Sequence, residues 1–371
     1  MRVTAVHQFL PSLAPRDAIG THTLAVQSIL RALGLESEIY ADLIHPEVAT
    51  LARPFRTFRG PRRGRGRGEL LLYQSSIGSR VADYLCVQPQ PKLVNYHNIT
   101  PAASLTRWEP ALADELAQGR RQLVALAPVT LHAVADSTFN ESELGASGYA
   151  STSVAPIQLD LDQPDPPTDG RCLARLARAR ARAGGGTDLL FVGRVVPNKA
   201  QHRLVRALAL YRRLYDPRAR LHLVGAVTSQ AYLRSVRGLV ERLGLVNAVD
   251  LAGPVSAAGL LAYYRSADVF VCLSDHEGFC LPLVEAMHHR LPIVAYAAAA
   301  VPETLGDAGV LIGSRDPLSV CVALARVLGD AELRASMSVG ATRRLAELSP
   351  ARIRAAFEAS LRRAIALAET A

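Results

Sequence analysis

The sequence has very little lysine. Lys92 and Lys199 are the only two lysines among 42 Lys and Arg residues, and arginine supplies the rest of the basic charge. Because this bias runs through the whole chain, the net charge of +9 does not by itself indicate a protein that binds nucleic acid, and no nucleic-acid partner is expected. A lysine that is kept inside a motif is correspondingly informative, and Lys199 is such a residue.

Cysteine is also scarce, and the cysteines are not spaced as they are in metal-binding or redox motifs. Five cysteines are scattered along the chain without a C-x-x-C pair: Cys86, Cys172, Cys272, Cys280 and Cys321. This pattern excludes a disulfide scaffold or a zinc finger and predicts reduced residues in the core. A D-x-D sequence at 160–162 falls in the stretch between the two halves of the chain, so we expect no metal cofactor.

Long apolar runs are absent as well. No stretch approaches the roughly 20 residues that a membrane-spanning helix needs, and the first residues lack the pattern of a signal peptide. We therefore expect a cytoplasmic protein. With 371 residues, of which 49% are hydrophobic, the chain is long enough for two domains of ordinary size.

Short apolar runs alternate with amphipathic helical stretches along most of the chain, which is typical of doubly wound α/β domains. In the first half, strands are predicted at Val3–Phe9, Glu38–Ala41, Leu70–Gln74, Lys92–Tyr96, His132–Ala135 and Ser153–Ile157. In the second half, strands are predicted at Leu189–Gly193, Arg220–Gly225, Val249–Gly253, Val269–Leu273, Pro292–Ala295 and Val310–Ile312. Helices between them include Gly20–Leu33, Trp108–Leu126 and Ala200–Leu214.

The stretch 160–186 interrupts this alternation with prolines, a basic segment and three consecutive glycines. We therefore expect an N-terminal Rossmann-like domain at 1–165, a linker at 166–186 and a second such domain at 187–348. A final helix at 349–371, opened by Ser349-Pro350, is expected to pack back on the first domain.

Two glutamates flank a turn directly after a predicted buried strand. Glu277 lies in the loop and Glu285 lies eight residues later in the opening helix, with Gly278 permitting a tight turn between them. A helix N-terminus attracts phosphate, and a carboxylate on that helix can accept hydrogen bonds from ribose hydroxyls. An arbitrary pair of glutamates is more often an ordinary feature of a first helical turn.

A pair of cations follows another predicted strand of the same half. Arg194 can fork onto phosphate oxygens, and Lys199 supplies a compact positive charge at the start of the next helix. Either cation alone is usually a solvated surface residue. The combination of these cations with the paired glutamates about 80 residues later favours a nucleotide-diphosphate site instead.

These motifs, Gly193-Arg194…Lys199 and Glu277-Gly-Phe-Cys-Leu-Pro-Leu-Val-Glu285, resemble the donor site of retaining glycosyltransferase family 4 and its E-x7-E pattern. The resemblance implies a GT-B fold, in which two doubly wound domains face a central cleft. It implies that Arg194 and Lys199 bind the donor diphosphate, that Glu285 binds the ribose, and that Glu277 lies against the transferred sugar as a catalytic residue. The residues between the two glutamates would complete the donor site: Gly278, Phe279, Cys280 and Leu281.

The chain shows one further match to the family, in its first half, and two departures from it. His97 follows a predicted strand and is similar in place to the family histidine that approaches the donor sugar, so the resemblance makes it a catalytic candidate. A lone histidine after a strand is otherwise more often structural. Gly20 stands where relatives have a glycine-rich turn near the phosphate, but only one glycine remains here, and Ala298-Ala299-Ala300 replaces glycines that many relatives have.

The resulting hypothesis is the transfer of a hexose, such as mannose or glucose, from a UDP- or GDP-sugar to a hydroxyl of a saccharide, lipid-linked or small-molecule acceptor, with retention of configuration. Alternatives are a sugar-nucleotide epimerase on the same scaffold, a silent sugar-nucleotide sensor, and an RNA-binding protein. The last would use the stretch Arg53–Arg67, which holds seven arginines. The preferred interpretation of that stretch is a surface loop. The second is a segment that contacts an anionic membrane or an anionic acceptor.

Overall fold

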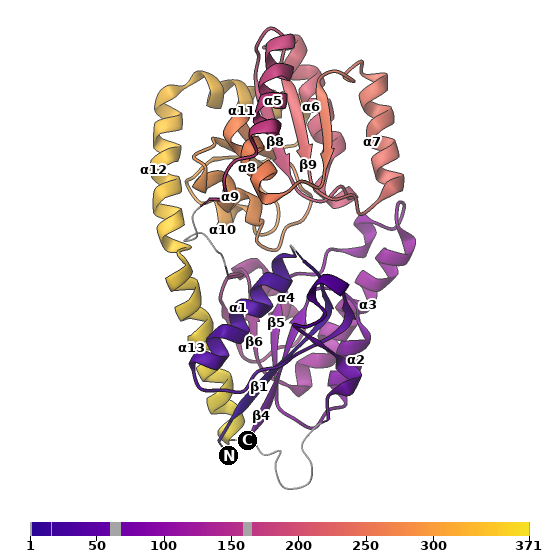
Figure 1. The fold of residues 1–371 in the computed structure, drawn as a ribbon, viewed down its shortest axis with the longest axis vertical. Helices are drawn as coiled ribbons and strands as arrows, with labels where there is room; N and C mark the ends of the chain where they lie inside the picture. The colour runs from indigo at the N-terminus through magenta and orange to yellow at the C-terminus, as the bar shows by residue number, and fades with distance from the viewer. Residues whose placement is uncertain (1, 16, 60–67, 159–164, 371) are drawn as a thin grey trace. The chain divides into compact units, whose positions relative to one another are not determined.

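A computed structural model of the chain describes residues 2–15, 17–59, 68–158 and 165–370. The chain divides into two compact units (Figure 1). Unit 1 consists of Met1–Ala103, Ala111–Asp160 and Leu348–Ala371, and unit 2 of Ser104–Pro110 and Leu161–Glu347. The D-x-D sequence at 160–162 lies outside the described residues.

Unit 1 is built on a seven-stranded parallel sheet with the order β3-β2-β1-β4-β5-β6-β7. The strands are β1 Ala5–Leu13, β2 Ile39–Ile44, β3 Arg53–Pro54, β4 Glu69–Ser75, β5 Lys92–Tyr96, β6 Thr130–Ala135 and β7 Thr152–Val154. The helices are α1 Ala18–Ala32, α2 Arg80–Cys86, α3 Pro110–Leu126, α4 Thr138–Ala146 and α13 Pro350–Thr370. Four short 3-10 helices lie between them: η1 Pro46–Val48, η2 Phe55–Thr57, η3 Ala102–Ser104 and η4 Ala127–Val129.

Unit 2 is built on a six-stranded parallel sheet with the order β10-β9-β8-β11-β12-β13. The strands are β8 Asp188–Val192, β9 Arg220–Val224, β10 Val249–Gly253, β11 Val269–Cys272, β12 Ile293–Tyr296 and β13 Val310–Ile312. The helices are α5 Gly170–Arg182, α6 Gln201–Leu214, α7 Gln230–Arg242, α8 Ala257–Ser266, α9 Leu281–His288, α10 Val301–Leu305, α11 Pro317–Gly329 and α12 Ala331–Glu347, with the 3-10 helix η5 at Pro197–Lys199.

The expected doubly wound α/β architecture is confirmed, because each predicted strand overlaps a strand of one of the two parallel sheets. The central strands are apolar on both faces, as parallel strands covered by helices on either side must be. In β11, for example, every side chain is buried. Only the two-residue strand β3 at the sheet edge was not anticipated, since Arg53-Pro54 carries no apolar pattern.

The division of the chain differs from the predicted one. The expected linker at 166–186 contains helix α5, which packs against α8 inside unit 2 and buries Leu176. The Asp169 carboxylate caps this helix by accepting hydrogen bonds from the amides of Arg171 and Cys172. Within the described residues, the prolines at 166 and 167 precede this helix and the glycines at 184–186 follow it.

The C-terminal helix α13 belongs to unit 1, where it packs against β6 and β7. Phe357 and Leu361 are fully buried and join the same hydrophobic core as Val6, Val26 and Leu70. The Phe357 ring meets the His22 ring edge to face, with 5.4 Å between the ring centroids. Among the described residues, no helix is both long and apolar enough to cross a bilayer.

Both sheets follow the strand order 3-2-1-4-5-6 of the doubly wound fold. In unit 2 the chain moves outward from β8 in one direction and then returns to add β11 on its other side. Loops at the carboxyl ends of two such neighbouring strands diverge and leave a ligand-binding crevice. The fold therefore brings the residues after β8 and after β11 to one place.

Candidate functional site

Lys199 and Glu277 form an ion pair beside this point of divergence in unit 2. Lys199 ends η5 after β8, Glu277 lies in the loop after β11, and Lys199 Nζ is 2.6 Å from both carboxylate oxygens of Glu277. The two side chains are only 18% and 7% exposed. Burial works to lower the pKa of Lys199, but the adjacent Glu277 carboxylate outweighs it, so the net pKa is raised and the lysine stays charged.

Sharp backbone turns set the position of both residues. Ala200, next to Lys199, has a φ of +53°, and Cys280, three residues after Glu277, has a φ of +68°. The left-handed region costs a non-glycine residue roughly 1–2 kcal/mol. Both residues are buried, so the surrounding packing holds these turns in place.

Glu285 lies on α9 and shares a hydrogen bond with a tyrosine. Tyr264 donates its hydroxyl to Glu285 Oε2 over 2.7 Å, and the Tyr264 side chain is buried. Burial raises the pKa of Glu285, although the bond from Tyr264 acts in the opposite direction. The sequence did not indicate Tyr264, which orients one of the carboxylates in the E-x7-E pattern.

Arg194 is exposed just beyond β8, and its guanidinium has no ion pair or hydrogen bond among the residues that the structure describes. Its backbone is held by Gln201, which donates Nε2 to the Arg194 carbonyl over 2.8 Å. The main chain of Arg194 is therefore held in place, while its cationic side chain is exposed. Lys199, by contrast, is already paired with Glu277.

The backbone next to Arg194 depends on a glycine in the neighbouring strand end. Gly225 has a φ of +145°, and a Cβ there would lie 2.2 Å from the Gly193 carbonyl oxygen. Gly193 also donates its amide to Val224 over 2.9 Å. The ends of β8 and β9 therefore approach so closely that no side chain fits between them.

The substitution Gly225→Ala is therefore expected to destabilise the protein by roughly 2–4 kcal/mol, through backbone strain and overpacking. Urea denaturation followed by circular dichroism measures this. Gly329→Ala is the matched control, because nothing lies within 4 Å of a Cβ built there. Equal stability of the two variants would contradict the close approach at Gly225.

Arg315, which the sequence analysis missed, follows β13 and pairs with Asp275 in the loop after β11. Its guanidinium lies over the Tyr296 ring, 4.3 Å from the centroid. Burial, assisted by the nearby Arg203, lowers the pKa of Arg315. The only signal in the sequence was its place just after a parallel strand, the same signal that located Arg194 and Lys199.

The residues between the two glutamates make the turn into α9. Phe279 and Cys280 are buried, and the Phe279 carbonyl accepts a hydrogen bond from the Thr304 hydroxyl. Leu281 begins the helix, and Gly278 lies in the loop that precedes it. The hydrogen bond to the Phe279 carbonyl and the left-handed backbone of Cys280 fix the start of α9. The sequence predicted that amides at this helix N-terminus bind the donor.

Three side chains near this turn have metal-ligand chemistry. Ligand atoms of Cys272, Glu277 and Cys280 lie within 4.8 Å of one another, and the two Sγ atoms are 4.0 Å apart. The Lys199 ammonium already lies against the Glu277 carboxylate. It therefore supplies the positive charge that a metal would bring to this position.

His97 belongs to unit 1, at the carboxyl end of β5, and its side chain is only 1% exposed. Its Nδ1 is 2.9 Å from Asp136 Oδ2, and its Nε2 is 2.8 Å from Gln74 Oε1. His22 packs edge to face on it, and burial with the nearby His97 lowers the pKa of His22 to about 3. The His97 imidazole thus has both nitrogens engaged inside unit 1, which sequence reasoning did not anticipate.

Gly20 does not form the open turn that the sequence suggested. It lies in the first turn of α1, and its amide donates to Asp17 Oδ2 over 2.9 Å. Asp17 is the N-cap of this helix, so the amide expected to face a phosphate is already used as a capping donor. A Cβ at Gly20 would also meet Leu13 Cδ1 at 3.2 Å, so this glycine serves packing.

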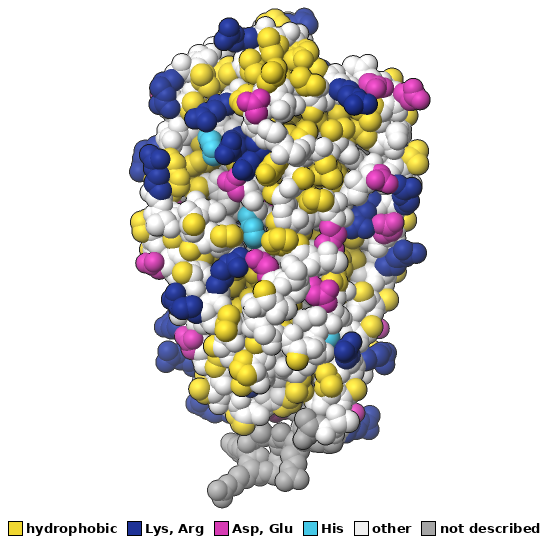
Figure 2. Space-filling model, turned by 180° about the vertical axis from the view of Figure 1, so that it is seen from behind, with side chains coloured by type: hydrophobic (Ala, Val, Ile, Leu, Met, Phe, Trp, Pro, Cys, Tyr) yellow, Lys and Arg dark blue, Asp and Glu magenta, His cyan; other side chains and the backbone are white. Residues whose placement is uncertain are grey.

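The arginine-rich stretch is described only in part, because residues 60–67 lie outside the described ranges. Within the rest, Arg53 pairs with Glu38 over 3.4 Å, and Arg56 lies over the Phe55 ring. On the face shown in Figure 2, basic side chains are scattered among acidic and apolar ones. That distribution is typical of a mixed surface rather than of a continuous nucleic-acid footprint.

Comparison with known proteins assigns the region that carries this site. Residues 175–344 match the protein family described as Glycosyl transferases group 1. This segment is therefore similar to the group 1 glycosyltransferases, and we call it the group 1 domain. The group 1 domain spans α5 to α12 and includes Arg194, Lys199, Glu277 and Glu285.

The similarity to curated proteins covers only part of the chain. A D-inositol 3-phosphate glycosyltransferase from Thermomonospora curvata is 34% identical over 188 residues, which cover 48% of this chain and 43% of that protein. The protein of the same name from Geodermatophilus obscurus is 33% identical over 237 residues, covering 61% of this chain and 50% of its own length. The chain therefore spans about half the length of these relatives.

Solved structures extend the similarity to the whole chain at the level of the fold. HepE from Anabaena, solved in complex with UDP and glucose, has a TM-score of 0.70 at 18% identity and covers 96% of this chain and 99% of its own. Sucrose-phosphate synthase from Thermosynechococcus elongatus has a TM-score of 0.73 at 18% identity, with 98% and 99% covered. The two units therefore have the GT-B fold that the resemblance implied.

Proposed function

We propose that the protein is a retaining hexosyltransferase of glycosyltransferase family 4, which transfers a sugar from a nucleotide diphosphate to an acceptor hydroxyl. The observation that carries the proposal is the buried Lys199–Glu277 pair at the divergence of β8 and β11, inside the group 1 domain. Arg194 follows β8, and Glu285 lies on α9, the helix that follows β11. In this arrangement the two cations bind the diphosphate of the donor. Glu277 contacts its sugar and Glu285 contacts its ribose.

In this proposal the leaving diphosphate is stabilised by cations of the chain. The exposed guanidinium of Arg194 takes phosphate oxygens in a fork, and the charged Lys199 adds a point charge close by. The attraction between these cations and the diphosphate is strongest when negative charge builds up in the transition state. The cations therefore lower the activation barrier more than they strengthen binding of the donor in the ground state. The mechanism includes no metal cofactor.

Glu277 is proposed to lie against the sugar as it gains positive character. Its carboxylate is held by two contacts of 2.6 Å from Lys199, so its position is set before the donor binds. His97 is proposed as the first unit's contribution to the sugar, after it exchanges a bond to Gln74 or Asp136 for one to the donor. We assign no covalent nucleophile.

The donor is proposed to be a uridine nucleotide, because structures similar in fold hold UDP and UDP-glucose. The names of the curated relatives make an inositol phosphate the first acceptor to test, beside saccharide and lipid-linked hydroxyls. A cytoplasmic location is part of the proposal, and so is contact of Arg53–Arg67 with an anionic acceptor or membrane.

A thermal-shift titration with UDP, GDP, ADP and their hexose conjugates tests the donor site. One uridine nucleotide at about 100 times its dissociation constant is expected to stabilise the protein by roughly 2.7 kcal/mol. The variant Glu285→Gln loses most of this stabilisation, because it removes the charged acceptor for the ribose hydroxyls. The exposed substitution Glu332→Gln is the control and leaves the shift unchanged.

Acid should weaken nucleotide binding in the parent protein. Since burial raises the pKa of Glu285, this carboxylate takes up its proton at a higher pH than an exposed glutamate does. Affinity therefore falls as the pH is lowered toward that pKa, and Glu285→Gln lacks this dependence. Stabilisation by none of the nucleotides would overturn the proposal, whereas conversion of a sugar nucleotide without any acceptor would indicate an epimerase.

A further inference from the structure

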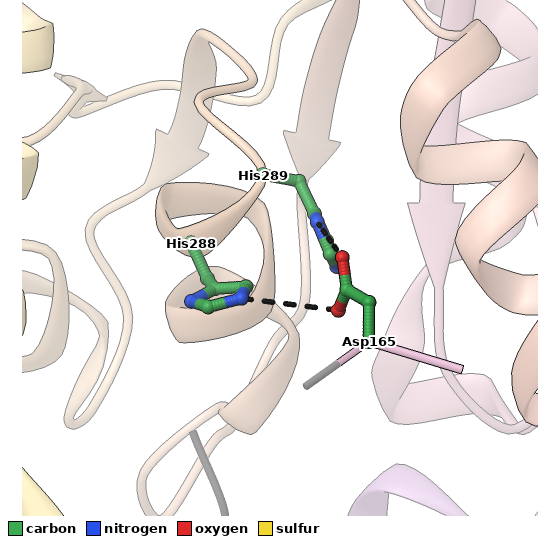
Figure 3. Close-up of side chains that lie close together, drawn as sticks. All are labelled: Asp165, His288 and His289. Atoms are coloured by element: carbon green, nitrogen blue, oxygen red, sulfur yellow. Dashed lines mark ion pairs between the residues drawn. The ribbon is translucent and has the colours of Figure 1, made fainter. Parts of the chain in front are cut away.

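Asp165, His288 and His289 come together on unit 2, and none of the three has been assigned a role above. His288 is the last residue of α9 and His289 is its C-cap, while Asp165 precedes α5. Figure 3 shows both imidazole rings turned toward the Asp165 carboxylate. His288 Nε2 is 3.9 Å from one carboxylate oxygen, and His289 Nδ1 is 4.0 Å from the other.

The three groups have the composition of a zinc site with an open position. Two imidazole nitrogens and one carboxylate are a common protein ligand set for Zn²⁺, with water as the fourth ligand. Zinc bonds of about 2.0–2.2 Å require ligand atoms about 3.3 Å apart. The present ligand atoms all lie within 4.8 Å of one another, so small side-chain rotations suffice to close the site.

The surroundings favour a cation in two ways. The last turn of α9 directs its carbonyls and the negative end of its dipole toward this position. The Asp165 carboxylate places a negative charge within 4.0 Å of one nitrogen of each imidazole, and this charge attracts a cation. The three side chains are 15–35% exposed, which leaves room for a bound water.

One group opposes metal binding. Arg265 Nη2 lies 3.2 Å from Asp165 Oδ2, and the same guanidinium bonds to the Thr168 hydroxyl. The guanidinium orients the carboxylate but also repels a second cation at short range. Removal of this charge should strengthen metal binding, an effect opposite in sign to removal of a ligand.

We propose that Asp165, His288 and His289 form a binding site for Zn²⁺ or a related first-row transition metal ion. The ion joins the segment at Asp165 to the end of α9, the helix that carries Glu285. His289 donates its amide to the Glu285 carbonyl over 3.0 Å, and its ring lies 4.9 Å from that of Tyr264, the hydroxyl partner of Glu285. Metal binding therefore rigidifies the C-terminal end of α9. The site is separate from the proposed transfer reaction and does not depend on it.

The test is a titration of tag-free, metal-stripped protein with Co²⁺, followed by its visible absorption, and with Zn²⁺ by calorimetry. One equivalent is expected to bind, with tetrahedral Co²⁺ bands that Zn²⁺ displaces. His288→Ala and Asp165→Asn are expected to weaken binding at least 10-fold. Arg265→Gln is expected to tighten it severalfold, and the exposed His45→Ala, in unit 1, is expected to leave it unchanged.

Three outcomes would overturn the assignment. The first is the absence of any heat or absorption change at millimolar metal. The second is full binding that persists in both His288→Ala and Asp165→Asn, with circular dichroism confirming that the variants are folded. The third is binding that is lost in Cys272→Ser instead, which would place the ion at the buried cluster of Cys272, Glu277 and Cys280.

Discussion

Replacing Lys199 by methionine is expected to lower turnover of the nucleotide sugar about 100- to 1,000-fold, the range found when one preorganised electrostatic donor is removed. The lysine is charged, mostly buried and fixed by two contacts of 2.6 Å to Glu277, so no solvent cation replaces it at low cost. Steady-state kinetics with the donor identified by thermal shift measures the effect. The loss is expected in kcat more than in KM, because the charge acts mainly on the departing diphosphate.

A double variant separates catalysis from folding. Lys199→Met alone leaves the Glu277 carboxylate buried without its partner, which destabilises the protein. The double variant Lys199→Met/Glu277→Gln removes both charges and is expected to recover most of the stability but none of the activity. A Lys199→Met enzyme that keeps kcat within threefold of the parent would contradict the assigned role.

The substitution Asp188→Ala is expected to destabilise unit 2 by about 3–5 kcal/mol, the usual cost of removing one partner from a buried ion pair. Asp188 opens β8 and receives Arg220 at 2.8 and 2.6 Å and His222 at 3.0 Å. All three side chains are at most 7% exposed. Without the Asp188 carboxylate, the positive charge of the Arg220 guanidinium stays buried with no negative charge to balance it.

The only tryptophan of the chain, Trp108, reports on this unfolding, because it belongs to unit 2 and its ring lies 5.4 Å from that of Tyr232. Urea denaturation followed by Trp108 fluorescence gives the free energy of unfolding of the variant. The exposed Asp114→Ala is the control and is expected to change it by less than about 0.5 kcal/mol. A loss below about 1 kcal/mol in Asp188→Ala would show that the network is not needed.

The same network predicts the pH dependence of stability. Burial works to raise the pKa of Asp188, but hydrogen bonds from His222 and Arg220 lower it on balance, so its stabilisation is present above the unfolded pKa and is lost as the pH falls through the folded one. His222 is the opposite case. Despite burial, bonds to Asp188 and Asp250 raise its pKa, so its contribution is complete below about 6.5 and is lost as the pH rises through the raised value.

Local sequence patterns were sufficient to find most of the fold and the positions of the cations and glutamates. Continuous apolar runs define buried parallel strands, and residues directly after such strands lie at the ligand-binding edge of the sheet. Lys199 and Glu277 were therefore placed correctly after β8 and β11. That they contact each other depends on the strand order, since β8 and β11 are neighbours although 76 residues of sequence lie between them.

Contacts between distant segments were not visible in the sequence. Tyr264 bonds to Glu285 from a different helix. Its position in the sequence of α8 predicts only a buried tyrosine and gives no sign of this partner. The sequence also did not show that His288 and His289 lie near Asp165, because Asp165 is far away along the chain and reaches them only through the tertiary fold. The helix predicted from Gly20 is confirmed as part of α1, but the sequence did not show that the Gly20 amide is bonded to the Asp17 side chain.

The discontinuous composition of unit 1 determines the order in which the two units can mature during translation. Unit 2 is complete once residue 347 has been synthesised, but the core of unit 1 still lacks Phe357 and Leu361 from α13. Until α13 emerges from the ribosome, the apolar side chains of β6 that it covers remain open to water. Unit 1 therefore begins to form first but completes its hydrophobic core last, and its exposed apolar face is the feature for which chaperones are most needed.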